Sequence, residues 1–288
     1  MRNHFFNSKR NFMKRNHSFL NIFLLTLLAL AGCQKFDHPS MPDYKKDPDN
    51  PGGVLKFYTA FEGVDLDSIK ATFGTATNAT YENGVTGKAY KGSTTSFIKY
   101  PSANDFAKST SFTISFWMKK VPQAPNAGAE FVFALPTTTD IWHKSEMFLL
   151  IEDGNQSTSA LGAFKFMIQD QWFEFVGAQR LQNVLNDQWH HLAFVYDETS
   201  SKLTTYIDGN ALTGLPPNLT DVKNAGNPRG KLSFKNVSGF VIGGPSHLAL
   251  NATPDTWMVK YTGSLDQFRI YSKALSAAEI TALFTAKQ

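Results

Sequence analysis

Three of the five tryptophans in this 288-residue chain lie in stretches rich in polar residues. Trp172 follows Gln169 and Gln171, while Trp142 and Trp257 stand beside other polar or charged side chains. An indole can stack on the C–H face of a sugar ring, and amides can bond to its hydroxyls. These five residues are therefore a predicted carbohydrate-binding site, with Trp172 as its main platform. Each tryptophan could instead seal the fold against its own core, a common role for so large an aromatic side chain.

The only cysteine, Cys33, ends a leader that is first basic and then apolar. Five Lys or Arg and no acid lie in residues 1–32, and the apolar run 19–31 is shorter than the about 20 residues that span a bilayer. The letters LAGC at 30–33 resemble the lipobox of bacterial lipoproteins. The resemblance implies a cleaved signal peptide over 1–32, a diacylglyceryl group on Cys33, and a protein anchored by lipid at the bacterial outer membrane or cell surface. A lone buried thiol is the alternative for Cys33, and Met13 is an alternative start.

The charge balance argues against a nucleic-acid partner. The chain has 28 Lys and Arg against 24 Asp and Glu, but five of the basic residues belong to the leader, so the mature part carries 23 basic and 24 acidic residues. Without a basic excess, binding to a phosphate backbone loses its main source of free energy. With one cysteine, the chain also has no internal disulfide, so burial must stabilise the fold.

Residues 34–53 are expected to be a solvated tether. They contain four prolines, two glycines and many charges, with too few apolar residues for a core. An extended chain of this composition spans about 3.1 Å per residue, so the lipidated Cys33 and the Pro/Asp-rich tether, together residues 33–53, would hold a domain some distance from the lipid. We expect that domain to be a single one over residues 54–288.

The domain is expected to be all-β. Short runs such as 112–118 and 203–207 alternate apolar with polar side chains, and more than ten such runs are separated by Gly, Asn, Asp and Pro. So many strands in one domain predict two packed sheets. The one convincing helix comes last, where Ser276 and Glu279 form a capping box ahead of an apolar stripe.

Four segments, taken in order, resemble the laminin G-like branch of the concanavalin A-like lectin/glucanase superfamily. The segments are GVTGKAY with SFIKYP at 84–90 and 96–101, FTISFWM at 112–118, QWHHLAFVYD with YIDG at 188–197 and 206–209, and GSLDQFRIYSKALS at 263–276. The resemblance implies a jelly-roll sandwich of two antiparallel sheets, one of them concave, with a short C-terminal helix. Because one fold serves many functions, it does not imply a single activity. Trp117 and Trp189 fall in these segments and are expected in the core.

The sequence predicts no catalysis. The E-x-D-x-x-E strand of the glucan-cleaving relatives is absent, and the acids Glu146, Glu152, Asp153 and Glu174 are scattered, as solvated charges would be. There is no G-x-S-x-G elbow, and the adjacent histidines at 190–191 must point to opposite faces of a strand. No histidine spacing suits zinc.

The resemblance also implies a structural calcium ion, although no cofactor is required. Glu62 and Asp266 stand at positions similar to those that join the first and last strands of related sandwiches through a cation. Two carboxylates with backbone carbonyls could supply the oxygens that calcium prefers. The alternative for Asp266 is a buried carboxylate bonded to backbone amides.

The sequence therefore predicts a membrane-anchored, non-catalytic surface lipoprotein that binds a polysaccharide or glycoconjugate. A protein-binding adhesion or assembly module is an alternative function, with a protein partner at the cell surface. A glycoside hydrolase of the same fold is a second alternative, which would need two facing carboxylates on the concave sheet.

Overall fold

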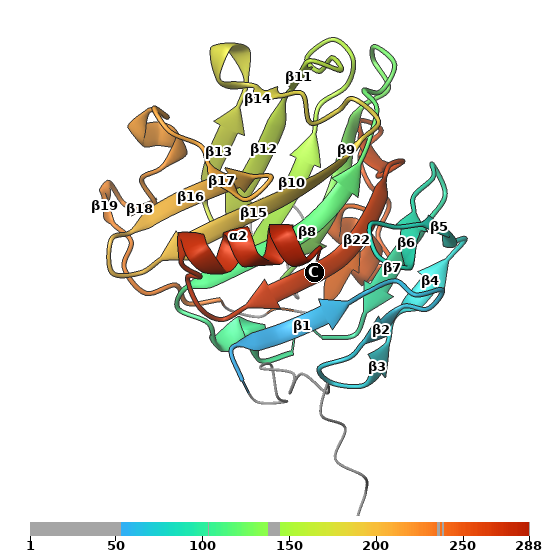
Figure 1. Cartoon of the computed structure of the whole chain (residues 1–288), viewed down its shortest axis with the longest axis horizontal. Helices are drawn as coiled ribbons and strands as arrows, with labels where there is room; N and C mark the ends of the chain where they lie inside the picture. The colour runs from blue at the N-terminus through green and yellow to red at the C-terminus, as the bar shows by residue number, and fades with distance from the viewer. Residues whose placement is uncertain (1–52, 103, 138–144, 235–236, 238, 288) are drawn as a thin grey trace, which may run out of the picture. The chain divides into compact units, whose positions relative to one another are not determined.

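The computed structural model describes residues 53–102, 104–137, 145–234, 237 and 239–287, and in it two β-sheets pack face to face (Figure 1). Within these ranges the first sheet has the strand order β17 (Asn210–Ala211), β16 (Lys202–Ile207), β15 (Trp189–Asp197), β8 (Phe112–Lys119), β22 (Ser264–Tyr271), β6 (Lys88–Lys91) and β5 (Thr80–Asn83), with β1 (Leu55–Thr59) also paired to β22. The second has the order β13 (Gln171–Phe175), β12 (Phe164–Ile168), β10 (Met147–Ile151), β9 (Ala129–Leu135), β20 (Phe240–Ile242), β7 (Phe97–Tyr100) and β4 (Thr75–Thr77), with β21 (Met258–Lys260) also paired to β9.

Pairing within the two sheets is antiparallel, apart from β21, which runs parallel to β9. Three two-stranded ribbons complete the described strands: β2 (Leu66–Asp67) with β3 (Thr72–Phe73), β11 (Leu161–Gly162) with β14 (Leu181–Gln182), and β18 (Lys223–Asn224) with β19 (Asn227–Pro228). The predicted sandwich of two main antiparallel sheets is confirmed.

The alternation of core-facing and outward side chains along β8 shows which face of the first sheet packs against the core. Phe112, Ile114, Phe116 and Met118 point inward and join the main apolar cluster between the sheets. Phenylalanine dominates this cluster, and Phe133 of β9 contacts four other rings, those of Phe116, Phe166, Phe240 and Phe268. Interlocked rings of this kind bury large apolar areas and favour edge-to-face packing.

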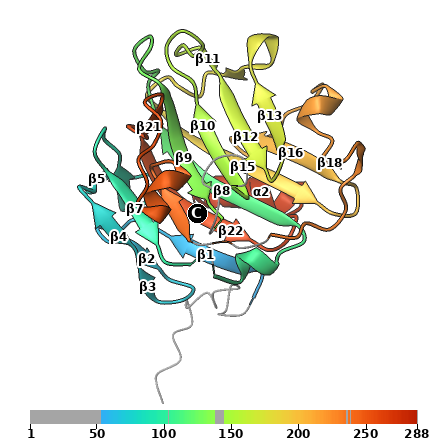
Figure 2. The ribbon, with the colours of Figure 1, turned by 180° about the vertical axis from the view of Figure 1, so that it is seen from behind.

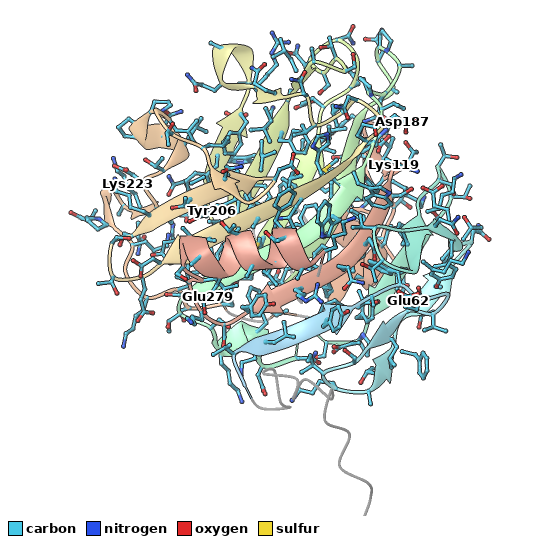
Figure 3. The ribbon with its side chains drawn as sticks, in the orientation of Figure 1. Glu62, Lys119, Asp187, Tyr206, Lys223 and Glu279 are labelled. Atoms are coloured by element: carbon cyan, nitrogen blue, oxygen red, sulfur yellow. The ribbon has the colours of Figure 1, made fainter. Side chains whose placement is uncertain are left out.

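The outer face of the first sheet is covered by helix α2 (Ala277–Ala286), as Figure 1 shows. The predicted capping box is present: the Ser276 side chain accepts from the backbone N–H of Glu279, and the Glu279 carboxylate accepts from the backbone N–H of Ser276 (Glu279 is labelled in Figure 3). Ile280 is fully buried, and the Phe284 ring stacks on Trp117 at 5.5 Å. No helix in the described ranges is both long enough and apolar enough to cross a membrane.

The outer face of the second sheet is apolar as well. β10 is buried along its whole length because Met147, Leu149 and Ile151 face the core while Phe148 and Leu150 face outward. The outward residues belong to a separate apolar cluster with members on β9, β12 and β21. Figure 2 shows this face, with α2 on the far side of the molecule. An apolar outer face on a β-sheet is a possible floor for a ligand site.

Candidate functional site

Strand register places the candidate site on the outer face of the second sheet. Leu150 of β10 pairs with Lys165 of β12, which in turn pairs with Glu174 of β13. Two residues further along β12, Met167 also faces outward and pairs with Trp172 of β13. Residues in register on neighbouring strands have side chains close together on one face, so these strands bring an apolar residue, two charges and an indole together.

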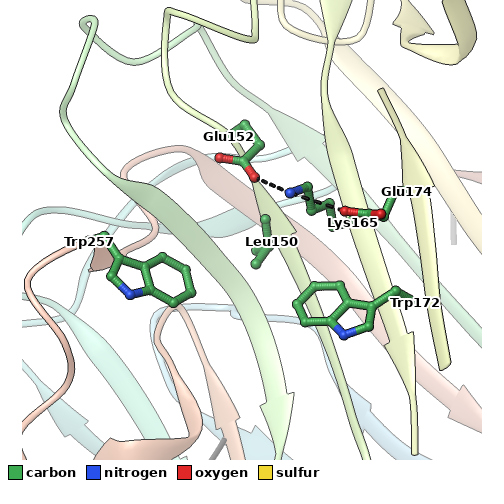
Figure 4. Close-up of a pocket in the computed structure, with 6 residues that line it drawn as sticks. All are labelled: Leu150, Glu152, Lys165, Trp172, Glu174 and Trp257. Atoms are coloured by element: carbon green, nitrogen blue, oxygen red, sulfur yellow. Dashed lines mark ion pairs between the residues drawn. The ribbon is translucent and has the colours of Figure 1, made fainter. Parts of the chain in front are cut away.

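A groove of about 390 Å³ lies over these rows. Trp172 and Trp257 stand on either side of it, with Leu150 between them, and three charged residues complete its lining (Figure 4). Trp257, just before β21, has 39% of its surface exposed, and Trp172 is half-buried. Two of the three predicted platform tryptophans therefore line the same groove.

Both indoles are held in place by phenylalanines of the outer apolar cluster. The Trp172 ring meets Phe148 edge-on, with centroids 5.2 Å apart, and the Trp257 ring lies 6.2 Å from Phe131. Each phenylalanine is buried. The aromatic walls are thus preorganised, which lowers the entropy that a ligand would lose on binding to them.

The charged part of the groove consists of two ion pairs that share Lys165. The Lys165 Nζ lies 2.7 Å from Glu152 Oε1 and 3.2 Å from Glu174 Oε1. Burial alone would lower the pKa of Lys165, but its hydrogen bonds to the two glutamates and their charges raise that pKa above its ordinary value. Glu152 and Glu174, which the sequence shows only as scattered acids, meet at one ammonium group.

The groove combines the two requirements of sugar recognition. Its indoles offer apolar surface for ring C–H groups above the buried Leu150, and the carboxylates of Glu152 and Glu174 are hydrogen-bond acceptors for hydroxyl groups. A mostly apolar hollow with a few convergent polar groups is typical of a small-ligand site.

The predicted glutamines do not line this groove. The Gln169 amide donates to Glu146 Oε2 and to a backbone carbonyl and accepts from Arg229. The Gln171 amide donates to the carbonyl of Asp221 at 2.7 Å and accepts from the backbone N–H of Lys223. Both side chains hold the segment 221–233 against the β12–β13 hairpin, so their amide groups are engaged within the protein.

Comparison with known families assigns the fold. The family model described as "Concanavalin A-like lectin/glucanases superfamily" matches residues 92–281. The chain belongs to this superfamily. Its sandwich is a concanavalin A-like, laminin G-like domain, as the four sequence segments indicated. No curated protein sequence matches the chain.

Solved structures share the concanavalin A-like fold at low identity. Domain 4 of AbnA, a GH43 extracellular arabinanase from Geobacillus stearothermophilus solved with arabinotriose, aligns with a TM-score of 0.53 and 19% identity over 80% of this chain and 97% of that one. A structure of botulinum neurotoxin type C aligns with a TM-score of 0.53 and 13% identity over 82% of this chain and 51% of that one. Its description states that cell entry of this toxin depends on interaction with two ganglioside molecules. Identities this low show the fold alone.

The predicted calcium residues meet at one turn of the concanavalin A-like domain. Asp266 Oδ2 accepts from the backbone N–H groups of Val85 and Thr86, and Glu62 Oε2 accepts from that of Lys88 (Glu62 is labelled in Figure 3). A Cβ at Gly84 would overlap with the Asp266 carboxylate, and one at Gly87 with the Glu62 carboxylate. The glycines of the GVTG segment therefore leave room for two carboxylates.

Asp266 is fully buried, and its Oδ1 has no hydrogen-bond partner. Burial raises the pKa of Asp266 to about 6, against the effect of its backbone hydrogen bonds, and the negative charge of Glu62 raises that pKa further. In the described ranges no group of three or more His, Cys, Asp or Glu could hold a metal ion. Among the described residues, further ligands for a cation would be neutral oxygens such as those of carbonyl groups, hydroxyl groups or water.

The histidine pair of the concanavalin A-like domain lies away from the groove. His191 is buried beneath α2, where its Nε2 lies 2.8 Å from Ser115 Oγ, and burial lowers its pKa to about 4. His190 bonds to Asp208 on the other side of the strand. Among the remaining indoles Trp117 is buried, whereas Trp189 is only partly buried, with the Lys119 Nζ 5.5 Å from its ring.

Two predicted site residues, Cys33 and Trp142, lie outside the described residues. Three residues that sequence reasoning did not assign to the site are Lys165, Glu152 and Glu174. A signal for Lys165 was present: it is the one charge in FKFMI, at an outward position of an otherwise apolar strand. Its partners follow only from the register of three strands.

Proposed function

We propose that this concanavalin A-like domain binds carbohydrate without cleaving it, in the groove between Trp172 and Trp257. The observation that carries the proposal is the pair of preorganised indoles beside the Glu152–Lys165–Glu174 ion pair. The architecture supports ring stacking on the walls and hydroxyl recognition at the carboxylates.

The charges of the groove support binding over hydrolysis. A glycosidase needs one carboxyl group protonated as the general acid and a second ionised. Here a single ammonium contacts both glutamates. The two carboxylates therefore share one ion-pair partner, whereas acid–base catalysis needs two carboxyl groups in different environments.

Two fold neighbours support a carbohydrate ligand in general terms. The arabinanase domain was solved with arabinotriose, and the neurotoxin structure concerns gangliosides. This is an analogy of fold, so the specific ligand of the present domain must come from its own groove.

Affinity electrophoresis of the whole protein through gels that contain soluble arabinan, galactan, glucan or mannan tests the proposal. Retardation by at least one polysaccharide is the expected result, with no reducing sugar released from it. The absence of retardation in every gel would exclude a polysaccharide-binding groove, and release of reducing sugar would show an enzyme.

We also propose that Cys33 carries the lipid that anchors the domain to a bacterial membrane. Palmitate fed to cells that express the protein is expected to label it, and Cys33→Ser is expected to abolish the label and release the protein from the membrane fraction. Two or more acyl chains anchor stably, whereas one gives only reversible binding. A Cys33→Ser protein that stays in the membrane fraction would rule out this anchor.

A structural calcium ion at Glu62 and Asp266 is a further proposal. The unpartnered Oδ1 of buried Asp266 is a free carboxylate oxygen close to a second carboxylate, and a cation there would neutralise both charges. The ion would join β1 to β22 at the GVTG turn, where it would stabilise the domain without taking part in ligand binding.

Calcium and pH should act on stability through Asp266. In a chelator, the folded pKa of about 6 exceeds the ordinary 3.8, so this residue's contribution to stability is present below pH 4 and is lost as the pH rises through 6, by about 3 kcal/mol at most. Asp266→Asn should remove this loss. Calcium should raise the thermal midpoint of the wild type at pH 7 but not that of Asp266→Asn; an equal rise in both would place the ion elsewhere.

A further inference from the structure

The formal charges of the residues that line the groove do not sum to zero. Of the six described residues that line it, Glu152 and Glu174 are acidic and Lys165 is basic, so these residues together carry one net negative charge. The ammonium of Lys165 can donate three hydrogen bonds, and its Nζ lies 2.7 Å from Glu152 Oε1 and 3.2 Å from Glu174 Oε1. Among the described residues, the one cation that lines the groove is thus already engaged by two anions.

This arrangement opposes an acidic sugar. A uronate or sialate is normally recognised by a free guanidinium or ammonium group. In this groove its carboxylate would instead approach two others across one shared lysine. The repulsion is significant because Glu152 and Lys165 are three-quarters buried and the indoles further exclude water.

The same arrangement favours hydroxyl donors. Each glutamate uses Oε1 for Lys165, which leaves its Oε2 as a second acceptor. Ionised carboxylates only accept hydrogen bonds. The lysine therefore orients two acceptors toward the groove, between which the indoles can hold a ring.

We infer that the groove selects neutral glycans against acidic ones, with Glu152 and Glu174 as acceptors for sugar hydroxyls and Lys165 as the residue that positions them. The inference rests on the proposed function and adds the class of ligand. It makes the net negative charge of the groove the cause of the selection.

Matched polysaccharides provide the test. Galactan, glucan and mannan would each be compared with the same polymer after oxidation of its primary hydroxyls to carboxylates, which changes the charge with little change in size. The whole protein should bind the oxidised form about tenfold more weakly at low salt, as expected for one net charge at a few ångströms under partial screening. The ratio of the affinities for the neutral and the oxidised polymer should fall toward one above about 0.5 M salt, since salt screens the repulsion between the carboxylates.

Charge variants separate electrostatic selection from a lost hydroxyl contact. Glu174→Gln brings the groove to zero net charge and leaves Glu152 on Lys165, so it should reduce the tenfold ratio to about threefold or less. Asp105→Asn is the matched control, because this acid also pairs with two lysines, Lys70 and Lys108, but does not line the groove. Its ratio should equal that of the wild type.

The outcomes separate the two proposals. Equal binding of neutral and oxidised polymers, or a ratio unchanged by both salt and Glu174→Gln, would overturn the selection while leaving carbohydrate binding intact. Failure to bind any polymer, neutral or oxidised, would overturn carbohydrate binding and the inferred selection with it.

Discussion

Trp172→Ala is expected to weaken carbohydrate binding by about 30-fold, which corresponds to about 2 kcal/mol. The indole forms one wall of the groove and is fixed by Phe148, so its loss removes both the stacking surface and its preorganisation. Isothermal titration with a retained polysaccharide measures the change. Unchanged affinity would exclude Trp172 as a platform.

Two further variants control for folding and for the loss of any indole. Trp257→Ala removes the opposite wall at an exposed position, where truncation should affect the core little, and should also weaken binding. Trp189→Ala removes a partly exposed indole that lies outside the groove and should leave affinity unchanged. Weakening of binding by Trp189→Ala would indicate a different binding face.

Lys120→Met is expected to lower the free energy of unfolding by about 3–5 kcal/mol. The Lys120 side chain, at the end of β8, is 3% exposed and lies 3.2 Å from Glu130 of β9, which is 1% exposed. The pair joins the two sheets, and Thr262 completes it by donating to both oxygens of Glu130. Removing the cation would leave a carboxylate buried without its counter-charge.

Chemical denaturation of the single and double variants measures this effect. The double variant Lys120→Met with Glu130→Leu should recover most of the lost stability, because it removes the unpaired charge together with its partner. A double variant as unstable as Lys120→Met alone would show that side-chain packing, and not charge, dominates at this junction.

The strands and the final helix could be predicted from local patterns. Along β8 every second residue is apolar and faces the core, and α2 begins at a capping box, so both follow from neighbouring residues alone. β10 also had a local signal, since an uninterrupted apolar run marks a strand that is covered on both faces.

The charged half of the groove could not be predicted in this way. Glu152, Lys165 and Glu174 come from three neighbouring segments of the second sheet, and they meet only because β12 pairs with β10 and β13 in one register. A shift of one residue would send Lys165 to the other face. Local pattern carries no information on which strands pair.

The predicted role of the glutamines depended on context that the sequence does not show. Gln169 and Gln171 flank Trp172 in sequence, but the segment 221–233 folds back onto the hairpin and engages both amides. That segment has no strand or helix pattern from which its path could be inferred. Glu62 and Asp266, by contrast, were placed together through family resemblance, and the structure brings both to the GVTG turn.

The most direct test of the groove is a nuclear magnetic resonance titration of the indole N–H signals, assigned by substitution of the five tryptophans. A neutral oligosaccharide from a retained polysaccharide should shift the signals of Trp172 and Trp257 in a saturable manner and leave those of Trp117 and Trp189 in place. Shifts confined to Trp117 or Trp189, or no shift at any indole, would contradict carbohydrate binding in this groove.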